Sequence, residues 1–394
     1  MQLLLFVLAI ILFIALVLVH EWGHYIIARR NGVEVEEFGL GLPPRAVSKK
    51  LKSGMLLSLN WLPLGGFVKL KGEHDSDSEP GSFGAARLRV KTKILLAGVT
   101  MNLLAGLVLL MILCWIGMPV LLSKDFNGQD QFTVKSDTHI THQEVEAGNV
   151  LPGSPADKAG LVSTDRITSV TGQGSPAVRQ INTQDQLHRA TSDFAGQGVQ
   201  IGLLHGNQGE VKNVKLLSRA EVAASHGAKG YLGVEPNQLT IQRSTWSAPI
   251  VAVGFTTQLV WLSLQGLGHA VGGVGSIIAG IFSGNHAARV AGQSEASSQV
   301  GGPVAIMQIL WNSGGLGFNF MLIFIAIISL TLALMNVLPI PALDGGRLFM
   351  TLISRGIFKR PLSRAAEERI VAGGMIFILA LIVLITIVDI NRSF

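Results

Sequence analysis

The segment His20-Glu21-Trp22-Gly23-His24 carries the residues of this 394-residue chain that are best suited to metal chemistry. Two histidines four residues apart lie on one face of a helix, about 6 Å from each other, so both imidazoles can reach a single ion. Glu21 lies beside the first histidine and can then act as a general base toward a water molecule. Polar groups are costly at the end of an apolar helix, which favours a functional role. The pattern predicts zinc ligation by His20 and His24, with Glu21 as the catalytic residue.

A third ligand is required, because hydrolytic zinc sites use three protein ligands and leave one position open. Asp344 is the best candidate, and it belongs to a motif that follows a long apolar run: Asn336-x-x-Pro339-x-Pro341-x-Leu343-Asp344-Gly345-Gly346. Its prolines and glycines predict irregular backbone, which is tolerated at membrane depth only against protein or a watery cavity. We therefore expect one Zn2+ per chain, bound by His20, His24 and Asp344.

The composition indicates an integral membrane protein. Hydrophobic residues make up 48% of the chain and charged residues only 14%, whereas about a quarter of the residues of a soluble domain are charged. So much apolar sequence also excludes a disordered chain. The single cysteine, Cys114, excludes an intramolecular disulfide and a multi-cysteine metal site. The net charge of +6 is attributed to membrane topology, and no nucleic acid partner is expected.

Four apolar runs are long enough to cross a bilayer, and the predicted transmembrane helices are 1–28, 94–122, 318–338 and 371–388. The first run lacks a basic segment before it, so we expect a retained span and not a cleaved signal peptide. The uncharged segment 244–288 is rich in glycine and polar residues. We expect membrane-surface or re-entrant helices there, since a single span would reverse the topology of everything after it.

The connections 29–93 and 347–369 are rich in Lys and Arg, which places them in the cytoplasm. The first and third spans then both end near the cytoplasmic face, and the predicted metal site lies on that side. The long segment after the second span is extracytoplasmic. Within it, residues 135–237 predict a compact α+β domain of alternating strands and short helices.

Two parts of the sequence resemble known families. The run from Pro152 to Leu161, followed by Asp165-Arg166-Ile167, resembles a bacterial PDZ domain, which binds extended peptide at an open sheet edge. The whole chain resembles the site-2 family of intramembrane metalloproteases, in particular the bacterial type that regulates sigma-E. The two motifs around residues 20–24 and 336–345 carry this resemblance.

Three further segments support the resemblance to site-2 proteases. Gly98 and Asn102 match a GxxxN element on the second span, and Gly65, Gly66 and Phe67 belong to a segment that looks like a membrane-reentrant β loop, at about 55–71. Gly301-Gly302-Pro303-Val304 looks like the segment before the third span. The implied fold class is membrane α-helical, with about four transmembrane helices, a membrane-reentrant β loop and an inserted α+β PDZ-like domain. The implied location is the bacterial inner membrane.

The resemblance implies zinc-dependent cleavage of transmembrane segments of single-span membrane proteins, such as anti-sigma factors or remnant signal peptides, in regulated intramembrane proteolysis. The implied substrate-binding residues are Asn102, Asn336, Pro339, Pro341, Gly65, Gly66 and Phe67. The PDZ-like domain is expected either to filter substrates by size or to bind a peptide or substrate segment. Two alternatives remain open: a membrane-anchored metallopeptidase with a water-facing site, and a non-enzymatic PDZ-bearing scaffold or transporter.

Overall fold

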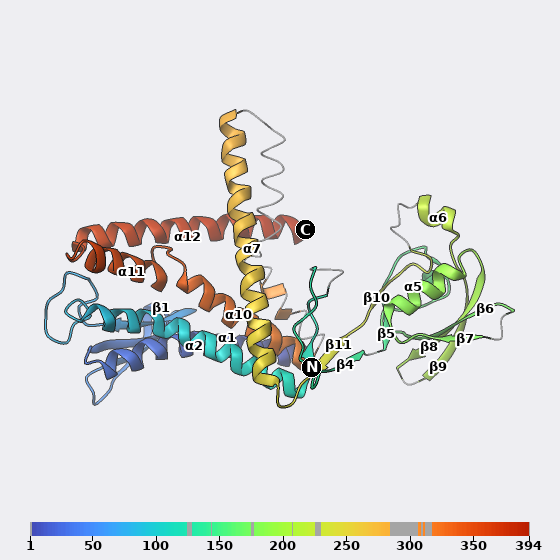
Figure 1. Ribbon diagram of the computed structural model, residues 1–394, viewed down its shortest axis with the longest axis horizontal. Helices are drawn as coiled ribbons and strands as arrows, with labels where there is room; N and C mark the ends of the chain where they lie inside the picture. Colours follow the sequence, from blue (N-terminus) through green and yellow to red (C-terminus); the bar gives the residue numbers. More distant parts are fainter. Residues whose placement is uncertain are drawn as a thin grey trace. The chain divides into compact units, whose positions relative to one another are not determined.

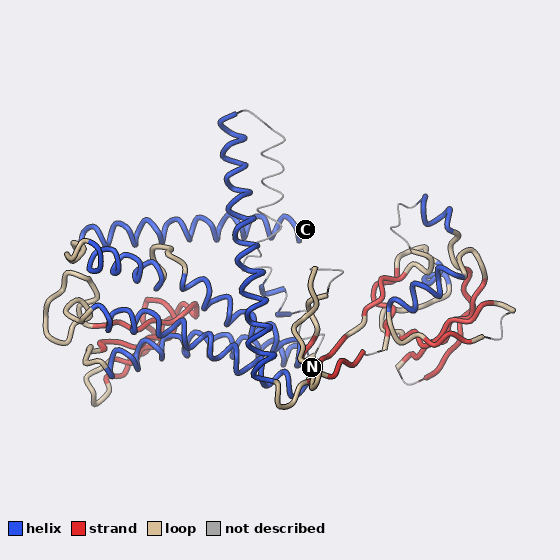
Figure 2. The backbone as a smooth tube through the Cα atoms, viewed as in Figure 1, coloured by secondary structure: helices blue, strands red, loops and turns tan. Residues whose placement is uncertain are grey.

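The computed structural model describes residues 2–123, 128–142, 144–174, 177–206, 208–224, 230–283, 306–308, 310–311 and 317–393. The chain forms two compact units. The helical unit comprises Met1–Ile116, Phe132–Val134 and Thr245–Phe394, and the inserted unit comprises Gly117–Gln131 and Lys135–Ser244. Helices dominate the helical unit and strands the inserted unit (Figure 1 and Figure 2).

Four helices of the helical unit are long and apolar enough to cross a membrane: α1 (Gln2–Arg30), α2 (Leu88–Ile116), α7 (Ala248–Ser283, over Ala248–Gly273) and α10 (Phe318–Val337). The protein is therefore a multi-pass membrane protein. The predicted span 371–388 lies within α12 (Arg364–Ser393), a helix whose side chains are described only in part beyond residue 383.

Close helix contacts organise the centre of the helical unit. Helix α2 packs against both α1 and α10. A Cβ atom at Gly23 of α1 would lie 2.7 Å from the backbone oxygen of Ala97 in α2, so only glycine permits this approach. On the other side of α2, Ser329 of α10 donates a hydrogen bond of 2.7 Å to the backbone oxygen of Asn102. These contacts place the end of α1 directly against the middle of α2.

One helix prediction needs correction. The second span begins at Leu88 and ends at Ile116, not at 94 and 122, because Gly117 adopts φ 120° and the strand β3 (Met118–Pro119) follows. For the segment 244–288 the sequence predicts membrane-surface or re-entrant helices, and its described part forms one continuous helix, α7, which is long and apolar enough to cross a membrane over Ala248–Gly273. Residues 284–288 lie outside the described residues.

An antiparallel hairpin joins α1 to α2. Strand β1 (Val35–Lys50) pairs with β2 (Leu56–Leu70), with Gly39 opposite Phe67 and Leu40 opposite Gly66. The hairpin packs against α1. Strand β2 coincides with the residues, about 55–71, for which the sequence predicts a re-entrant β loop.

A tight turn connects α10 to the short helix α11 (Asp344–Thr351), which continues into the π-helix η1 (Leu352–Ile357). Ala342 has a left-handed φ of 81°. A Cβ atom at Gly345 would lie 2.3 Å from the backbone oxygen of Val337, and one at Gly346 would lie 2.1 Å from that of Ile340. The two glycines therefore allow the chain to fold back onto the end of α10 and present Asp344 at the start of α11.

The inserted unit is an α+β domain with a six-stranded antiparallel sheet in the order β10-β5-β6-β8-β9, in which β7 also pairs with β6. Its core contains Val145, Ile167, Val170 and Ile201, all fully buried. A second sheet has the order β3-β11-β4. The remaining elements are β4 (His139–His142), β5 (Val145–Val150), α4 (Pro155–Lys158), β6 (Arg166–Gly172), β7 (Val178–Gln180), α5 (Gln184–Asp193), β8 (Gly198–His205), β9 (Gln208–Lys215), α6 (Arg219–Ala224), β10 (Val234–Asn237) and β11 (Thr240–Arg243).

Candidate metal centre

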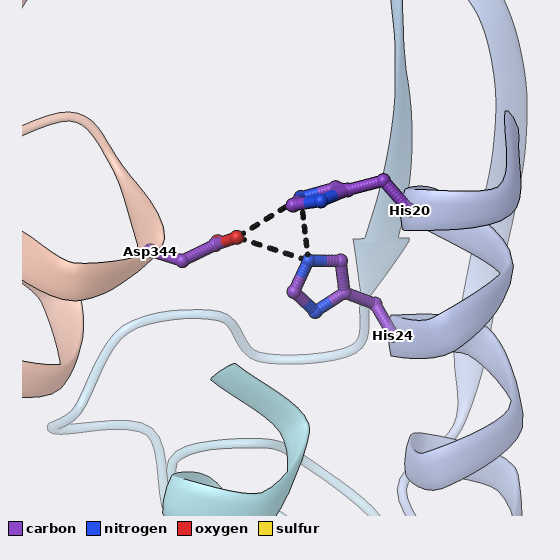
Figure 3. A group of neighbouring side chains, drawn as sticks. All are labelled: His20, His24 and Asp344. Atoms are coloured by element: carbon purple, nitrogen blue, oxygen red, sulfur yellow. Dashed lines mark hydrogen bonds and ion pairs between the residues drawn. The ribbon is translucent and has the colours of Figure 1, made fainter. Parts of the chain in front are cut away.

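The three predicted ligands meet at one point. His20 and His24 project from one face of α1, and Asp344 points toward them from the start of α11 (Figure 3). Oδ2 of Asp344 lies 3.1 Å from Nε2 of His20 and 3.1 Å from Nε2 of His24, and the two nitrogens are 3.2 Å apart. Among the residues that the structure describes, this is the one cluster of such side chains with ligand atoms close enough to share a metal ion.

The three ligand atoms have the spacing that zinc requires. Bonds of about 2.0–2.1 Å from a tetrahedral zinc ion to N and O ligands separate those ligands by about 3.3 Å. The observed separations of 3.1, 3.1 and 3.2 Å come close to the three edges of one face of such a tetrahedron. Two imidazole nitrogens and one carboxylate oxygen are also a donor set typical of hydrolytic zinc sites. The residues present therefore fit Zn2+.

Each histidine is held through its other ring nitrogen. Nδ1 of His24 donates a hydrogen bond of 2.8 Å to the backbone oxygen of Ile94 in α2. This bond leaves Nε2 of His24 without a hydrogen and free to ligate a metal. Nδ1 of His20 lies 3.2 Å from the side-chain nitrogen of Asn102, also in α2.

The amide of Asn102 fits better when it is turned over. Its Oδ1 atom is buried and has no hydrogen-bond partner, and a His20 that ligates through Nε2 carries a hydrogen on Nδ1. The oxygen and nitrogen of an amide are assigned from the hydrogen-bond network. Exchanging them lets Oδ1 of Asn102 accept the hydrogen bond from Nδ1 of His20.

The metal centre has room because residue 98 is glycine. A Cβ atom at Gly98 would lie 2.4 Å from Nε2 of His24 and 2.6 Å from both Nε2 and Cε1 of His20. Any side chain at this position of α2 would displace the two imidazoles. Gly98 and Asn102, one helical turn apart on the same face of α2, thus give both rings space and give His20 a hydrogen bond.

The carboxylate of Asp344 is held in its ionised form. Burial alone would raise its pKa, but in the metal-free centre hydrogen bonds from protonated His20 and His24 outweigh burial and hold the pKa well below its ordinary value; a bound metal takes the place of the hydrogens on the two Nε2 atoms. An anionic oxygen is therefore present between the two imidazoles throughout the neutral range. This is the charge state in which a carboxylate binds a divalent cation.

Glu21 faces the hairpin. The backbone of Val68 in β2 lies near its carboxylate. A Cβ atom at Gly66 would lie 3.3 Å from Cγ of Glu21 and 3.4 Å from Val17, so β2 runs directly against α1 here. The hairpin thus lies beside the acid that is the candidate general base.

The other predicted site residues lie at different distances from the three ligands. Asn102 is 1% exposed and contacts His20, which suits a residue that orients a ligand better than one that binds substrate directly. Asn336 lies in the last turn of α10 and Pro339 and Pro341 in the turn that leads to Asp344. The segment 301–304 lies outside the described residues.

Two supporting contacts had little or no signal in the sequence. The backbone oxygen of Ile94 is an acceptor that every residue offers, so no residue type could mark it. Ser329 was visible only as one of two hydroxyl residues, with Thr331, within the apolar run of α10, where it is fully buried and anchors α10 to Asn102.

Comparison with known proteins agrees with this centre. The model of the family described as Peptidase family M50 matches residues 8–381. A protein of Clostridium perfringens named "putative zinc metalloprotease" is 28% identical over 97% of both chains, and one of Clostridium acetobutylicum with the same description is 30% identical over 88% of this chain and 86% of its own. A third, from Campylobacter jejuni, is 27% identical over 96% and 90%. The chain belongs to peptidase family M50, the site-2 protease family, and is a zinc metalloprotease.

Proposed function

We propose that this zinc metalloprotease cleaves transmembrane segments of single-span membrane proteins. The observation that carries the proposal is the origin of the ligands: two come from the apolar helix α1, and the third follows directly on the apolar helix α10. A site built at the ends of such helices is reached by a substrate that itself lies in the bilayer. Membership of a zinc metalloprotease family argues against the non-enzymatic scaffold or transporter, so a water-facing metallopeptidase is the remaining alternative.

The proposed roles follow from the geometry. His20, His24 and Asp344 hold Zn2+, and the bound metal supplies Lewis acidity that lowers the pKa of a water molecule toward about 7. Glu21 takes the proton of the attacking water and later delivers it to the leaving nitrogen of the cleaved peptide bond. Asn102 and the backbone oxygen of Ile94 keep the imidazoles of His20 and His24 in place.

The substrate must be extended before it is cut, since the carbonyl of a helical peptide bond is engaged in the helix. We propose that the hairpin is a re-entrant β loop and that its segment Gly65, Gly66 and Phe67 pairs with the unwound substrate beside Glu21. The contact between Gly66 and Glu21 supports this role. Asn336, Pro339 and Pro341 are proposed to lie along the other side of the same substrate segment.

The inserted unit is proposed to be a PDZ-like domain on the extracytoplasmic side of a bacterial inner membrane. The antiparallel sheet with short helices α4 and α5 is compatible with such a domain, and the Lys- and Arg-rich connections favour a cytoplasmic metal site. We favour a filter that admits substrates with trimmed extracytoplasmic parts, as expected in regulated intramembrane proteolysis of anti-sigma factors or remnant signal peptides. Deleting residues 135–237 should then broaden cleavage, whereas lost cleavage would indicate docking of a substrate terminus.

The decisive experiment compares two substrates and two enzymes. Purified wild-type protein and the Glu21→Gln variant are incubated with a single-span substrate in detergent or vesicles, and with a soluble peptide of the same scissile sequence. We expect the wild type to cut the single-span substrate preferentially. Glu21→Gln should retain zinc, since Glu21 is not a ligand, and lose cleavage. Equal cleavage of the soluble peptide would instead favour the water-facing metallopeptidase.

A further inference from the structure

A buried cluster of charges lies apart from the three ligands and centres on Asp75, in the loop between β2 and α2. Asp75 is 4% exposed, and Lys91 of α2, which donates a short hydrogen bond to it, is 1% exposed. Arg355 of η1 donates from Nε to Oδ2 of Asp75 at 3.0 Å, and Ser354 donates to the same oxygen at 3.3 Å. One carboxylate thus joins α2 to η1.

Burying a cluster of charges such as this one costs free energy. Burying a charge costs several kcal/mol per ion, and apolar replacements of buried ion pairs are often neutral or stabilising. Such pairs are best explained where they fix one arrangement of the elements that they join. Within the described part of the chain, the carboxylate of Asp75 accepts hydrogen bonds from the side chains of Lys91, Ser354 and Arg355. It also accepts one of 3.2 Å from the backbone N–H of Leu362. We therefore infer that Asp75 fixes the arrangement of α2 and η1.

Both elements joined by Asp75 support the metal centre. Lys91 lies one helical turn before Ile94, whose backbone oxygen holds His24. Arg355 and Ser354 lie in η1, which continues the helix that begins at Asp344. The carboxylate of Asp75 therefore connects the helix that orients a histidine ligand with the helix that presents the aspartate ligand.

A second contact between the same parts strengthens this connection. Arg347, one turn after Asp344, donates a hydrogen bond of 2.9 Å to the backbone oxygen of Glu73, in the loop that carries Asp75. The guanidinium of Arg347 lies 5.5 Å from the ring centre of Phe83, and the ammonium of Lys91 lies 5.4 Å from the same ring. Phe83 is 3% exposed. The loop between β2 and α2 thus contacts the start of α11 through Glu73 and the start of α2 through Asp75.

We propose that Asp75 is a positioning residue of the metal centre: through Lys91 and Arg355 it sets the distance at which Asp344 meets the two histidines. The proposal rests on the zinc site described above. Asp75 itself touches neither the ligands nor the substrate. Its effect is transmitted by the rigid helices α2 and α11–η1.

The test measures zinc affinity in the full-length protein. The purified protein is stripped of metal with a chelator and then titrated with Zn2+ against a chromogenic competitor, while its unfolding temperature is followed without metal. Arg355→Gln is the main variant, because Lys91 still neutralises Asp75 when Arg355 is removed. We expect a zinc Kd several-fold higher than that of the wild type, smaller than the about 10–100-fold that follows the loss of a direct partner of a ligand, because Arg355 reaches the ligands only through Asp75 and the helices. Asp75→Asn should act in the same direction and more strongly.

Glu37→Gln is the matched control. Glu37 is as buried as Asp75, at 5% exposure, and pairs with Arg45 at 2.6 Å and with Ser58 at 2.6 Å, but these partners lie within the hairpin. This variant should lose thermal stability with unchanged zinc affinity. Arg355→Lys should fall between wild type and Arg355→Gln, since it keeps the charge and loses the fork of donors.

Two results would overturn the proposal. One is wild-type zinc affinity in folded Arg355→Gln and Asp75→Asn. The other is an equal loss of zinc affinity in Glu37→Gln, which would show a general effect of destabilisation. A wild-type protein that binds no zinc would instead refute the metal centre itself, so the two failures are distinguishable.

Discussion

Replacing Gly98 by alanine adds one methyl group at the metal centre. The added Cβ atom would lie 2.4 Å from Nε2 of His24 and 2.6 Å from Nε2 of His20, whereas ordinary contacts begin at 3.4 Å. The nearer imidazole must therefore retreat by about 1 Å, while zinc ligation tolerates displacements of only about 0.2 Å. We expect zinc affinity to fall at least about 100-fold, or about 2.7 kcal/mol, because a ligand itself is displaced.

The fold should survive this change. Alanine is favoured over glycine within a helix by about 1 kcal/mol, so metal-free Gly98→Ala should unfold at a temperature close to that of the wild type. Zinc content by mass spectrometry and Kd by chelator competition would measure the loss. Gly106→Ala is the control on the same helix. Its Cβ would meet the end of the Leu330 side chain at 2.7 Å, far along α2 from the ligands, and it should keep zinc. Tight zinc binding by Gly98→Ala would refute the assignment of the site.

Three further predictions concern the surroundings of the site. Burial raises the pKa of Asp75, but hydrogen bonds from Lys91 and Arg355 outweigh burial and lower the pKa below its ordinary value. The folding stability that these bonds add is complete at neutral pH and is lost below about pH 4. Circular dichroism during acid titration should therefore show a steeper loss of structure for the wild type than for Asp75→Asn. Ala342→Gly removes the strain of a left-handed φ of 81° and should stabilise the protein by about 0.5 kcal/mol, as seen by a small rise in the unfolding temperature; a fall would show that the turn is not strained. Val68→Pro removes a backbone N–H of β2 close to Glu21 and should impair cleavage while zinc binding persists, whereas unimpaired cleavage would end the proposed pairing of substrate with the hairpin.

The closeness of His20, His24 and Asp344 could be predicted from the spacing of the histidines within a helix and from the positions at which the apolar runs end. The spacing of His20 and His24 fixes their common face once α1 is a helix. The length of the apolar runs fixes where α1 and α10 end, and Asp344 follows directly on α10. Residue types and run lengths therefore contain most of the information for the three ligands, and the structure brings their atoms within 3.2 Å of one another.

The supports of those ligands could not be predicted in the same way. The resemblance to site-2 proteases implied that Asn102 binds substrate; in the structure its amide contacts His20. The contact depends on how α2 is rotated against α1, which is decided by the fit of Gly23 against Ala97. Likewise, the sequence predicted helices in 244–288 but not that α7 is continuous, because its glycines and polar residues weaken helix propensity without preventing a helix. Its first turns bury Val251, Ala252 and Phe255, and this packing outweighs the weak propensity.

The position of Asp75 shows why metal ligands are easier to predict from the sequence than the residues that position them, which we call supports. A ligand must be one of a few residue types, so it can be recognised singly. A support is defined by what it joins: Asp75 matters because Lys91 and Arg355, widely separated in the sequence, converge on it. Because zinc tolerates displacements of only about 0.2 Å, the precision of the centre must come from such distant contacts as well as from the three ligands. Variation at these supports would therefore tune metal affinity while every recognisable motif stayed intact.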